Sequence, residues 1–275
     1  MNTIWSKHVQ GTKTLYYSRK LRFHDMFAEQ YKTLFAINDN MNIKILEIGC
    51  GPGALAGALH RWYSNAEIVA IDRDSEFISF AKKHESGITF MEGDATSLPF
   101  EDNSFDVVIS NTVSEHIETS RFYGEQIRIL KADGICLVLS ARKGINIAPS
   151  CVALNEYEKR FWKKAEKYDD TMDKYSICKY PMNEAELPVA MEKYGFRNIS
   201  TGFVTIDLTP DNPKFSGTLA HDIINANRYT DIDAIDSVLN TMPEHFTVKE
   251  IEEMKRLANE KYDTRIGQYD RGARQ

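Results

Sequence analysis

The sequence predicts a doubly wound α/β fold, built on a mostly parallel sheet with helical additions at both ends of the chain. From Ile43 to Arg142, short apolar runs alternate with amphipathic segments, which is typical of parallel strands joined by crossover helices. The strands are almost continuously apolar, as expected of a sheet covered on both faces. A glycine-rich turn follows the first strand, where the backbone can approach a ligand closely.

Five strands are expected in this region. Asp74 or Ser75 can cap the helix after the second strand, because either side chain accepts hydrogen bonds from a helix N-terminus. Asp133-Gly134 provides a turn before the fifth strand. The expected strands comprise residues 43–48, 68–71, 88–91, 105–109 and 135–139.

The flanking segments have mainly helical patterns. Residues 1–40 look helical, particularly from Ser18 onward, because apolar residues recur near the helical period. Residues 199–208 have the composition of a sixth strand, and everything after Pro210 looks helical. Further helices are expected over 155–168, over 184–194 and from the capping-box pair Thr247 and Glu250 onward.

These patterns divide the chain into four expected parts. They are an N-terminal helical lid over 1–40, a ligand-binding core over 41–144, a helical insertion with the last core helix and strand over 145–210, and a C-terminal helical segment over 211–275.

Composition excludes several function classes. The 34 basic and 40 acidic residues give a net charge of −6, whereas nucleic-acid binders usually carry a basic stripe, so no nucleic-acid partner is expected. The four cysteines form no C-x-x-C pair, and no Cys/His group has zinc-ligand spacing, so no metal is expected. No apolar run approaches the ~20 residues that span a bilayer, and the N-terminus lacks a secretory pattern. We therefore expect a soluble cytoplasmic protein without a membrane partner.

The glycine-rich turn has the sequence Glu47-Ile48-Gly49-Cys50-Gly51-Pro52-Gly53-Ala54. Gly49-x-Gly51-x-x-Ala54 fits the looser dinucleotide fingerprint, in which a helix N-terminus binds a pyrophosphate. Glu47, two residues before the first glycine, would oppose that dianion. Its charge instead suits S-adenosylmethionine, which carries a sulfonium and an ammonium group and no phosphate. Alternatively, Glu47 accepts hydrogen bonds from the N–H groups of the turn.

Acidic residues also follow the next two strands. Asp72 closes the second strand, where a carboxylate can accept both hydroxyls of a ribose. Asp94 follows the third strand, where it can accept the amino group of an adenine. The alternatives are helix capping for Asp72 and an ordinary turn for Asp94. Together with Glu47, these residues predict a pocket for a nucleoside with a positively charged tail.

Four motifs in order resemble the class I S-adenosylmethionine-dependent methyltransferases, and within them the branch that includes the ubiquinone and menaquinone methyltransferases. They are LEIGCGPG at 46–53, VAID at 69–72, GDATSLPFEDNSFDVVIS at 93–110 and RILKADGICLVLS at 128–140. The resemblance covers Ile45 to about Leu139. It implies a Rossmann-like core, S-adenosylmethionine as the cofactor, and methyl transfer, but it says little about the methyl acceptor, which we expect to be a small molecule.

The resemblance also implies roles for individual residues. Glu47 and the glycine backbone should line the methionine end of the cofactor, Asp72 the ribose, and Asp94 with Ala95 the adenine. His116 faces the reaction site in many relatives and is the candidate general base, with Glu115 behind it; a supporting role for His116 stays open. The implied cofactor-binding set is Glu47, Gly49, Gly51, Asp72, Arg73, Asp94, Ala95, Asn111 and, from the lid, Tyr16, Tyr17 and Arg22, whose aromatic members could equally be core packing.

One departure from the family pattern affects the expected architecture. The family sheet has seven strands, yet nothing after Asp211 reads as a strand. The C-terminal helices are therefore expected to pack near the open sheet edge, to cap the acceptor pocket, or to leave the edge to the partner in a homodimer. Two other functions stay open, a nicotinamide-dependent oxidoreductase and a non-catalytic S-adenosylmethionine-binding protein.

Overall fold

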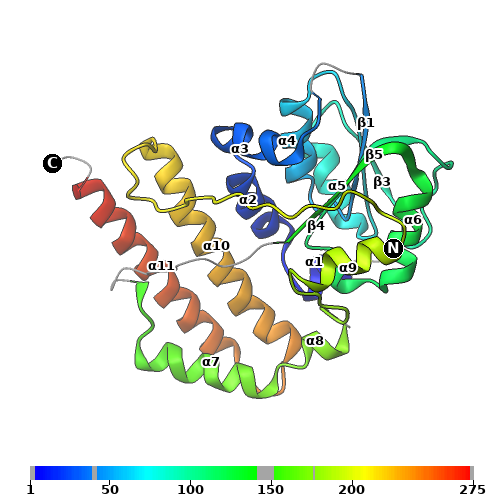
Figure 1. Cartoon of the computed structure of the whole chain (residues 1–275). Helices are drawn as coiled ribbons and strands as arrows, with labels where there is room; N and C mark the ends of the chain where they lie inside the picture. Colours follow the sequence, from blue (N-terminus) through cyan, green and yellow to red (C-terminus); the bar gives the residue numbers. More distant parts are fainter. Residues whose placement is uncertain (1–3, 39–41, 141–151, 176, 273–275) are drawn as a thin grey trace.

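The computed structural model describes residues 4–38, 42–140, 152–175 and 177–272. Its centre is a parallel sheet of five strands in the order β3-β2-β1-β4-β5 (Figure 1). This confirms the predicted doubly wound parallel sheet, whereas the expected end of the core at residue 144 lies outside the described residues. The strands are β1 (Lys44–Ile48), β2 (Glu67–Asp72), β3 (Thr89–Glu92), β4 (Phe105–Asn111) and β5 (Leu130–Leu139).

Both faces of the sheet are covered by crossover helices. Successive strand residues point to opposite faces, so Ile45 joins one core cluster and Leu46 the other. The Ile45 cluster includes residues of α4 (Ala54–Trp62) and α5 (Ser75–His84), and the Leu46 cluster includes residues of α6 (Thr119–Ile129). After β1 the chain continues to β2, which pairs with one side of β1, and it later returns to β4, which pairs with the other side of β1. The carboxyl ends of β1 and β4 therefore form a topological switch point, where such sheets bind ligands.

The turn expected at Asp133-Gly134 is wrong, because these residues lie inside a longer β5. The inner strand β4 pairs with the edge strand β5 at Phe105 and Leu130, and then again at Val107 and Ile135 after a shift of register. The turn-forming residues thus occupy an irregularity within the strand. A Cβ at Gly134 would lie 2.7 Å from the Leu130 side chain, which explains why glycine stands there.

The sixth strand expected over 199–208 is also wrong, because this segment pairs with no strand in the described part of the chain. Its alternating residues Val204, Ile206 and Leu208 nevertheless pack against the Ile45 cluster, while Phe203 is 78% exposed. Strand-like composition indicates a half-buried extended surface, and here that surface forms without backbone pairing.

The N-terminal residues are helical from Ile4, in agreement with the helical pattern expected over 1–40. They form α1 (Ile4–His8), α2 (Thr12–Arg22), the 3₁₀ turn η1 (Asp25–Phe27) and α3 (Ala28–Phe35). Hydrogen bonds anchor the first two helices. The Ser6 N–H and hydroxyl donate to Asp74, at 2.8 and 3.0 Å, and the Gly11 N–H donates to Asp233 at 2.7 Å. Asp74 also caps α5, as expected.

The C-terminal helices form a layer beside the sheet (Figure 1). A shared core joins Phe161 of α7, Val238 of α10 and Met254 of α11, and α10 also packs on α2. Their main contacts are thus with each other and the lid rather than with the edge strand β5, so the expected packing against that edge is not found. None of the described helices has the length and apolar character needed to cross a bilayer. The layer consists of α7 (Glu156–Tyr168), α10 (Gly217–Thr241) and α11 (Val248–Gly272). Between α7 and α10 the chain forms α8 (Thr171–Lys174) and α9 (Glu186–Lys193), and Met191 of α9 packs in the Leu46 cluster on the sheet.

We expect Met254→Ala to lower the free energy of unfolding by about 2–5 kcal/mol, because it opens a cavity where three helices meet. Val248→Ala, at a position 59% exposed on the same helix, should change it by about 0.5 kcal/mol or less. Urea unfolding of both variants measures the difference. Equal losses would show that the C-terminal layer is not a cooperative part of the fold.

Candidate functional site

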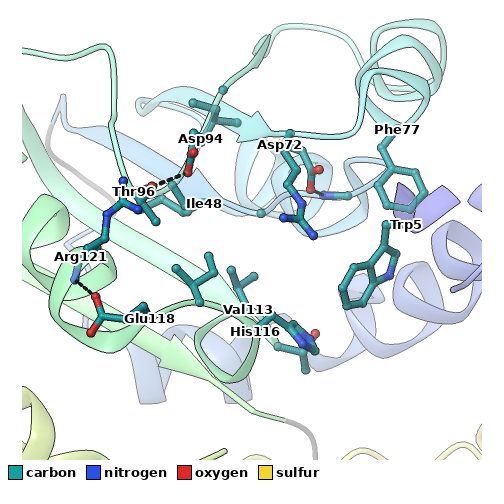
Figure 2. A pocket seen from close by; sticks show the side chains of 18 of the residues that line it. Trp5, Ile48, Asp72, Phe77, Asp94, Thr96, Val113, His116, Glu118 and Arg121 are labelled. Carbon is teal, nitrogen blue, oxygen red and sulfur yellow. Dashed lines mark hydrogen bonds between the residues drawn. The ribbon is translucent and has the colours of Figure 1, made fainter. Parts of the chain in front are cut away.

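A cavity of about 380 Å³ opens at the switch point (Figure 2). Its floor is formed by the ends of β1 and β2 and by the turns after β1, β3 and β4. Trp5 of α1 and two residues of α2 close it from the lid side. Seven of the predicted site residues line the cavity, namely Gly49, Gly51, Asp72, Arg73, Asp94, Ala95 and His116.

The glycine turn requires backbone conformations that side chains rarely allow. Gly49, Gly51 and Gly53 all have positive φ, at 68°, 56° and 89°. A Cβ at Gly49 would also lie 2.4 Å from the Val113 side chain. The N–H groups of Gly49 and Cys50 donate to the Ile71 carbonyl, which ties the turn to β2. The backbone itself thus forms one wall of the cavity.

Glu47 lies beneath this wall rather than on it. It is 1% exposed, and neither carboxylate oxygen has a hydrogen-bond partner among the described residues. Burial raises the pKa of Glu47 to about 8, against the opposing effect of the Arg19 charge. A buried carboxylate left without donors under a ligand-facing turn fits a cationic group with N–H donors, such as an ammonium, and does not fit a pyrophosphate. The alternative in which Glu47 accepts hydrogen bonds from the turn is not seen.

Asp72 joins the end of β2 to the glycine turn. One carboxylate oxygen accepts the Gly51 N–H and the other accepts the Asp74 N–H, both at 2.8 Å. Burial raises the pKa of Asp72 despite these two bonds. Each oxygen keeps a second lone pair, so the carboxylate can still accept hydroxyl groups from the cavity. Because Asp74 caps α5, that role is not left to Asp72.

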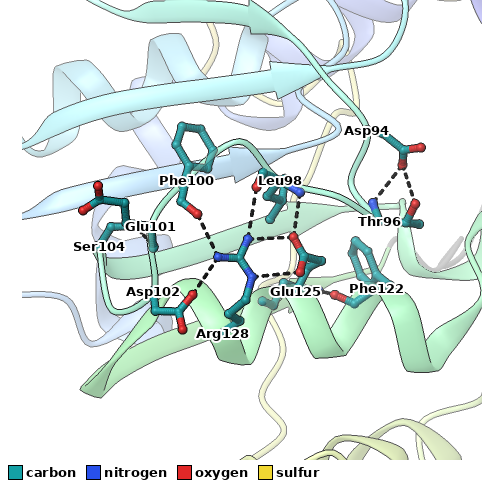
Figure 3. A network of polar contacts seen from close by, with 11 residues as sticks. Asp94, Thr96, Leu98, Phe100, Glu101, Asp102, Ser104, Phe122, Glu125 and Arg128 are labelled. Atoms are coloured by element: carbon teal, nitrogen blue, oxygen red, sulfur yellow. Dashed lines mark hydrogen bonds and ion pairs between the residues drawn. The ribbon is translucent and has the colours of Figure 1, made fainter.

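Asp94 stands at the opposite end of the cavity floor, where the Thr96 N–H and hydroxyl both donate to it at 2.8 Å (Figure 2). Burial alone would raise the pKa of Asp94, but these two bonds hold it below its usual value. A network behind this loop fixes its position (Figure 3). Arg128 of α6 donates to the Leu98 and Phe100 carbonyls, at 3.0 and 2.8 Å, and pairs with Glu125.

His116 belongs to a 3₁₀ turn, η2 (Ser114–His116), and faces the cavity beside Trp5 (Figure 2). Its Nδ1 accepts the Cys178 N–H at 2.9 Å, so the neutral ring carries its proton on Nε2. Burial lowers the pKa of His116, and the charges of Arg73 and Arg19 lower it further against the effect of Glu115. As placed, His116 is a hydrogen-bond donor to the cavity. Accepting a proton at Nδ1 would break its bond to Cys178.

Besides Glu47, four predicted residues do not line the cavity. Asn111 is buried at the end of β4, and the next residue, Thr112, lines the cavity instead. Tyr16 donates to Glu85 at 2.7 Å, while Tyr17 is 40% exposed and its ring lies near Tyr229. Arg22 accepts a bond from Tyr31 through its carbonyl group. The residues of α2 that line the cavity are thus not the predicted Tyr16, Tyr17 and Arg22.

The side of α2 that lines the cavity carries Leu15 and Arg19, four residues apart on one helical face. Arg19 donates to the Thr112 hydroxyl at 2.7 Å and lies against Gly51. The spacing of four residues between Leu15 and Arg19 could have indicated from the sequence that both lie on one face of a helix. Trp5, Lys179 and Tyr180 had no such signal, because long-range contacts bring them to the site.

The comparisons with known proteins fit this geometry. Residues 46–138 match a family model described as a methyltransferase domain. They form an S-adenosylmethionine-dependent methyltransferase domain. This domain contains the glycine turn, Asp72, Asp94 and His116, whereas Trp5, Arg19 and Lys179 come from outside it.

Relatives of the methyltransferase domain act on lipids according to their names. The chain is 34% identical over 121 residues to a fatty-acid O-methyltransferase of Mycolicibacterium smegmatis, covering 42% of this chain and 44% of that one. It is 35% identical over 108 residues to phthiotriol/phenolphthiotriol dimycocerosates methyltransferase 1 of Mycobacterium ulcerans, covering 38% and 40%. The chain thus spans less than half the length of these relatives. The matches support the methyltransferase class without supporting the ubiquinone and menaquinone branch.

A solved structure extends the likeness of fold beyond the domain. Phosphoethanolamine N-methyltransferase 2 of Haemonchus contortus, in complex with S-adenosylmethionine, superposes with a TM-score of 0.52 at 18% identity. The match covers 94% of this chain and 55% of that one. At this identity the likeness concerns the fold alone, including its helical additions.

We expect Glu47→Gln to become more stable relative to the parent protein as the pH rises from about 5 to 8, without added ligand. The unfolded Glu47 ionises near pH ~4.3, whereas the folded residue keeps its proton to about pH 8, so the parent loses free energy of unfolding across this window. The relative gain should be on the order of 1–4 kcal/mol. Urea unfolding at several pH values measures it. Glu92→Gln, at an exposed site, should parallel the parent; a parallel profile for Glu47→Gln would contradict the buried, protonated carboxylate.

Proposed function

We propose that the protein transfers the methyl group of S-adenosylmethionine to a small-molecule acceptor with an apolar part. The observation that carries this proposal is the buried, unpartnered Glu47 beneath a ligand-facing glycine turn, within a methyltransferase domain. Its placement supports binding of a positively charged amino-acid tail and gives no support to the nicotinamide-dependent alternative. The lipid names of the relatives support an acceptor with apolar character. A quinone-like acceptor of the ubiquinone and menaquinone branch belongs to the same proposal.

The lining residues, together with Glu47 beneath the glycine turn, divide into groups that would hold the cofactor from end to end. Glu47 and the glycine turn would hold the methionine end, Asp72 the ribose hydroxyls, and Asp94 with Ala95 the adenine. When bound, the cofactor supplies a methyl group already activated by its sulfonium. The protein therefore has to align an acceptor with the methyl group and exclude water, for which Trp5 and the α2 face provide the cover.

The apolar residues of the cavity support the second part of the proposal. Trp5 and Phe77 lie side by side at one end, and Val113 lies along the floor near His116 (Figure 2). Apolar walls with a few placed polar groups are typical of small-molecule sites. They would accept the body of a hydrophobic molecule while the polar residues orient its reacting group.

Calorimetry with S-adenosylmethionine, S-adenosylhomocysteine and NADH tests the cofactor. We expect the first two to bind and NADH not to bind. Asp72→Ala should weaken S-adenosylmethionine by about tenfold or more, because the ribose loses charge-assisted hydrogen bonds. Asp133→Ala, at an exposed site in β5, should bind like the parent.

Asp72→Asn keeps one acceptor oxygen for the glycine turn, so it separates ligand binding from support of the turn. It should bind less tightly than the parent, and its thermal unfolding without ligand should fall less than that of Asp72→Ala, because the amide oxygen replaces one of the two acceptors that Asp72 provides. NADH binding tighter than S-adenosylmethionine binding, or unchanged affinity in Asp72→Ala, would overturn the proposed cofactor site.

A further inference from the structure

We infer that Asp233 of α10 is a positioning residue for the cofactor site, because it fixes the lid helix α2 so that Arg19 reaches Thr112 over the glycine turn. The inference rests on the proposed function and gives the C-terminal layer a part in it. Asp233 lies outside the methyltransferase domain and does not line the cavity. Its effect on the cofactor therefore has to pass through α2.

The helix α2 lies between the C-terminal layer and the cavity (Figure 1). It packs on α10 on one side and on α4 and α5 on the other. Toward α10, the Thr14 hydroxyl donates to the Tyr229 carbonyl at 3.4 Å, and the ring of Tyr17 lies 6.2 Å from that of Tyr229. Leu15 and Arg19 lie on the cavity side. The position of α2 against α10 thus sets where these two cavity residues lie.

Asp233 supplies the negative charge that the N-terminus of α2 lacks. The N-cap residue is Gly11, which has no side chain to accept a hydrogen bond, and the first turn of α2 carries no acidic residue. The Asp233 carboxylate instead accepts the Gly11 N–H at 2.7 Å. A carboxylate at this end of a helix also interacts favourably with the helix dipole. One contact across 222 residues of chain therefore anchors the start of α2.

The glycine at position 11 is explained by the close approach of α10. Its φ of −62° is open to any residue, so the backbone conformation does not require glycine there. A Cβ at Gly11, however, would lie 2.3 Å from a carboxylate oxygen of Asp233. A larger residue would push α2 and α10 apart.

The anchor at Gly11 reaches the cavity through a continuous helix. The Leu15 N–H donates to the Gly11 carbonyl at 3.0 Å, and α2 then continues to Arg22. At the helical rise per residue, Arg19 lies about 12 Å along the axis from Gly11. A shift or tilt of the start of α2 therefore moves Arg19.

The position of Arg19 is set by a contact that tolerates little movement. Its guanidinium donates to the Thr112 hydroxyl at 2.7 Å, and Nη1 would lie 3.4 Å from a Cβ on Gly51. Thr112 has a φ of 55°, which is rare for a β-branched residue and persists only where its surroundings hold it. The bond to Thr112 uses one of the five N–H groups of Arg19, so donors remain for the carboxylate at the methionine end of the cofactor. Because hydrogen bonds weaken steeply outside a narrow range of geometry, a displaced α2 would lose this arrangement.

Two ligands that differ only at the amino-acid end test the inference by calorimetry. S-adenosylhomocysteine carries the amino-acid tail, whereas 5′-methylthioadenosine has the same nucleoside without it. Asp233→Ala should weaken S-adenosylhomocysteine by about threefold or more and leave 5′-methylthioadenosine unchanged, because Arg19 lies at the turn expected to hold the tail. A general loss of stability would not distinguish the two ligands.

Asp236→Ala is the matched control on the same helix. It removes a carboxylate three residues along α10 that pairs with Lys255 of α11 at 2.9 Å. This variant should bind both ligands like the parent, because Asp236 contacts α11 rather than α2.

Two further variants test the contact itself. Asp233→Asn keeps an oxygen that can accept the Gly11 N–H, so its affinity for S-adenosylhomocysteine should lie between those of the parent and Asp233→Ala. Gly11→Ala retains the carboxylate but places a Cβ against it, and should reproduce the selective loss seen in Asp233→Ala.

A double-mutant cycle tests whether Asp233 acts through Arg19. Arg19→Gln should itself weaken S-adenosylhomocysteine. The double variant Asp233→Ala/Arg19→Gln should weaken it no more than Arg19→Gln alone, because residues that act through one another are not additive.

The outcomes separate the two proposals. If the parent protein fails to bind S-adenosylhomocysteine, the proposed function is overturned, and the inference with it. If the parent binds it, while Asp233→Ala binds both ligands like the parent or loses both affinities equally, the inference is overturned and the proposed function stands. A double variant whose loss is the product of the two single losses would likewise overturn the inference alone.

Discussion

The link between the glycine turn and Asp72 is the constraint on which the site depends. The turn needs three glycines at positive φ, and its backbone is fixed by bonds to the Ile71 carbonyl and to the Asp72 carboxylate. Parallel pairing of β1 with β2 brings these groups together at one edge of the sheet. The other residues of the cavity lie around this turn. Arg19 lies over it, and Glu47 lies beneath it.

The features predicted most accurately from the sequence are those that depend on local residue patterns and on the order of the strands. Apolar runs located the five strands, and acidic residues after three of them predicted the lining positions of Asp72 and Asp94. Composition failed where tertiary contact replaces backbone pairing, as in residues 199–208, which pack like a strand without joining the sheet. Asp133 and Gly134, which are typical turn residues, lie within β5, because this edge strand tolerates a shift of register at that point.

Three residues of the cavity wall could not be predicted from the motifs, for a different reason. Trp5, Arg19 and Lys179 lie outside the motif-bearing core and reach the cavity through contacts between distant segments. Lys179 is placed by backbone hydrogen bonds to Glu115 and His116, and no side-chain pattern encodes those. The helical phase of α2 decides that Arg19, and not Tyr16 or Tyr17, lines the cavity. The motifs therefore predict the part of the cavity that the strand ends form, whereas the part formed by other segments depends on the assembled fold.

Asp74 links two helices that line the cavity through a single carboxylate. It accepts the N–H groups of Glu76 and Phe77 at the start of α5, and also the N–H and hydroxyl of Ser6 in α1. The helix that carries Phe77 and the helix that carries Trp5 thus share one anchor. During divergence of this chain, a substitution at Asp74 would shift both aromatic walls at once, whereas a change at Ser6 would shift only the wall that carries Trp5. Descendants with altered acceptors should therefore vary first at the N-terminal helix, with the start of α5 preserved.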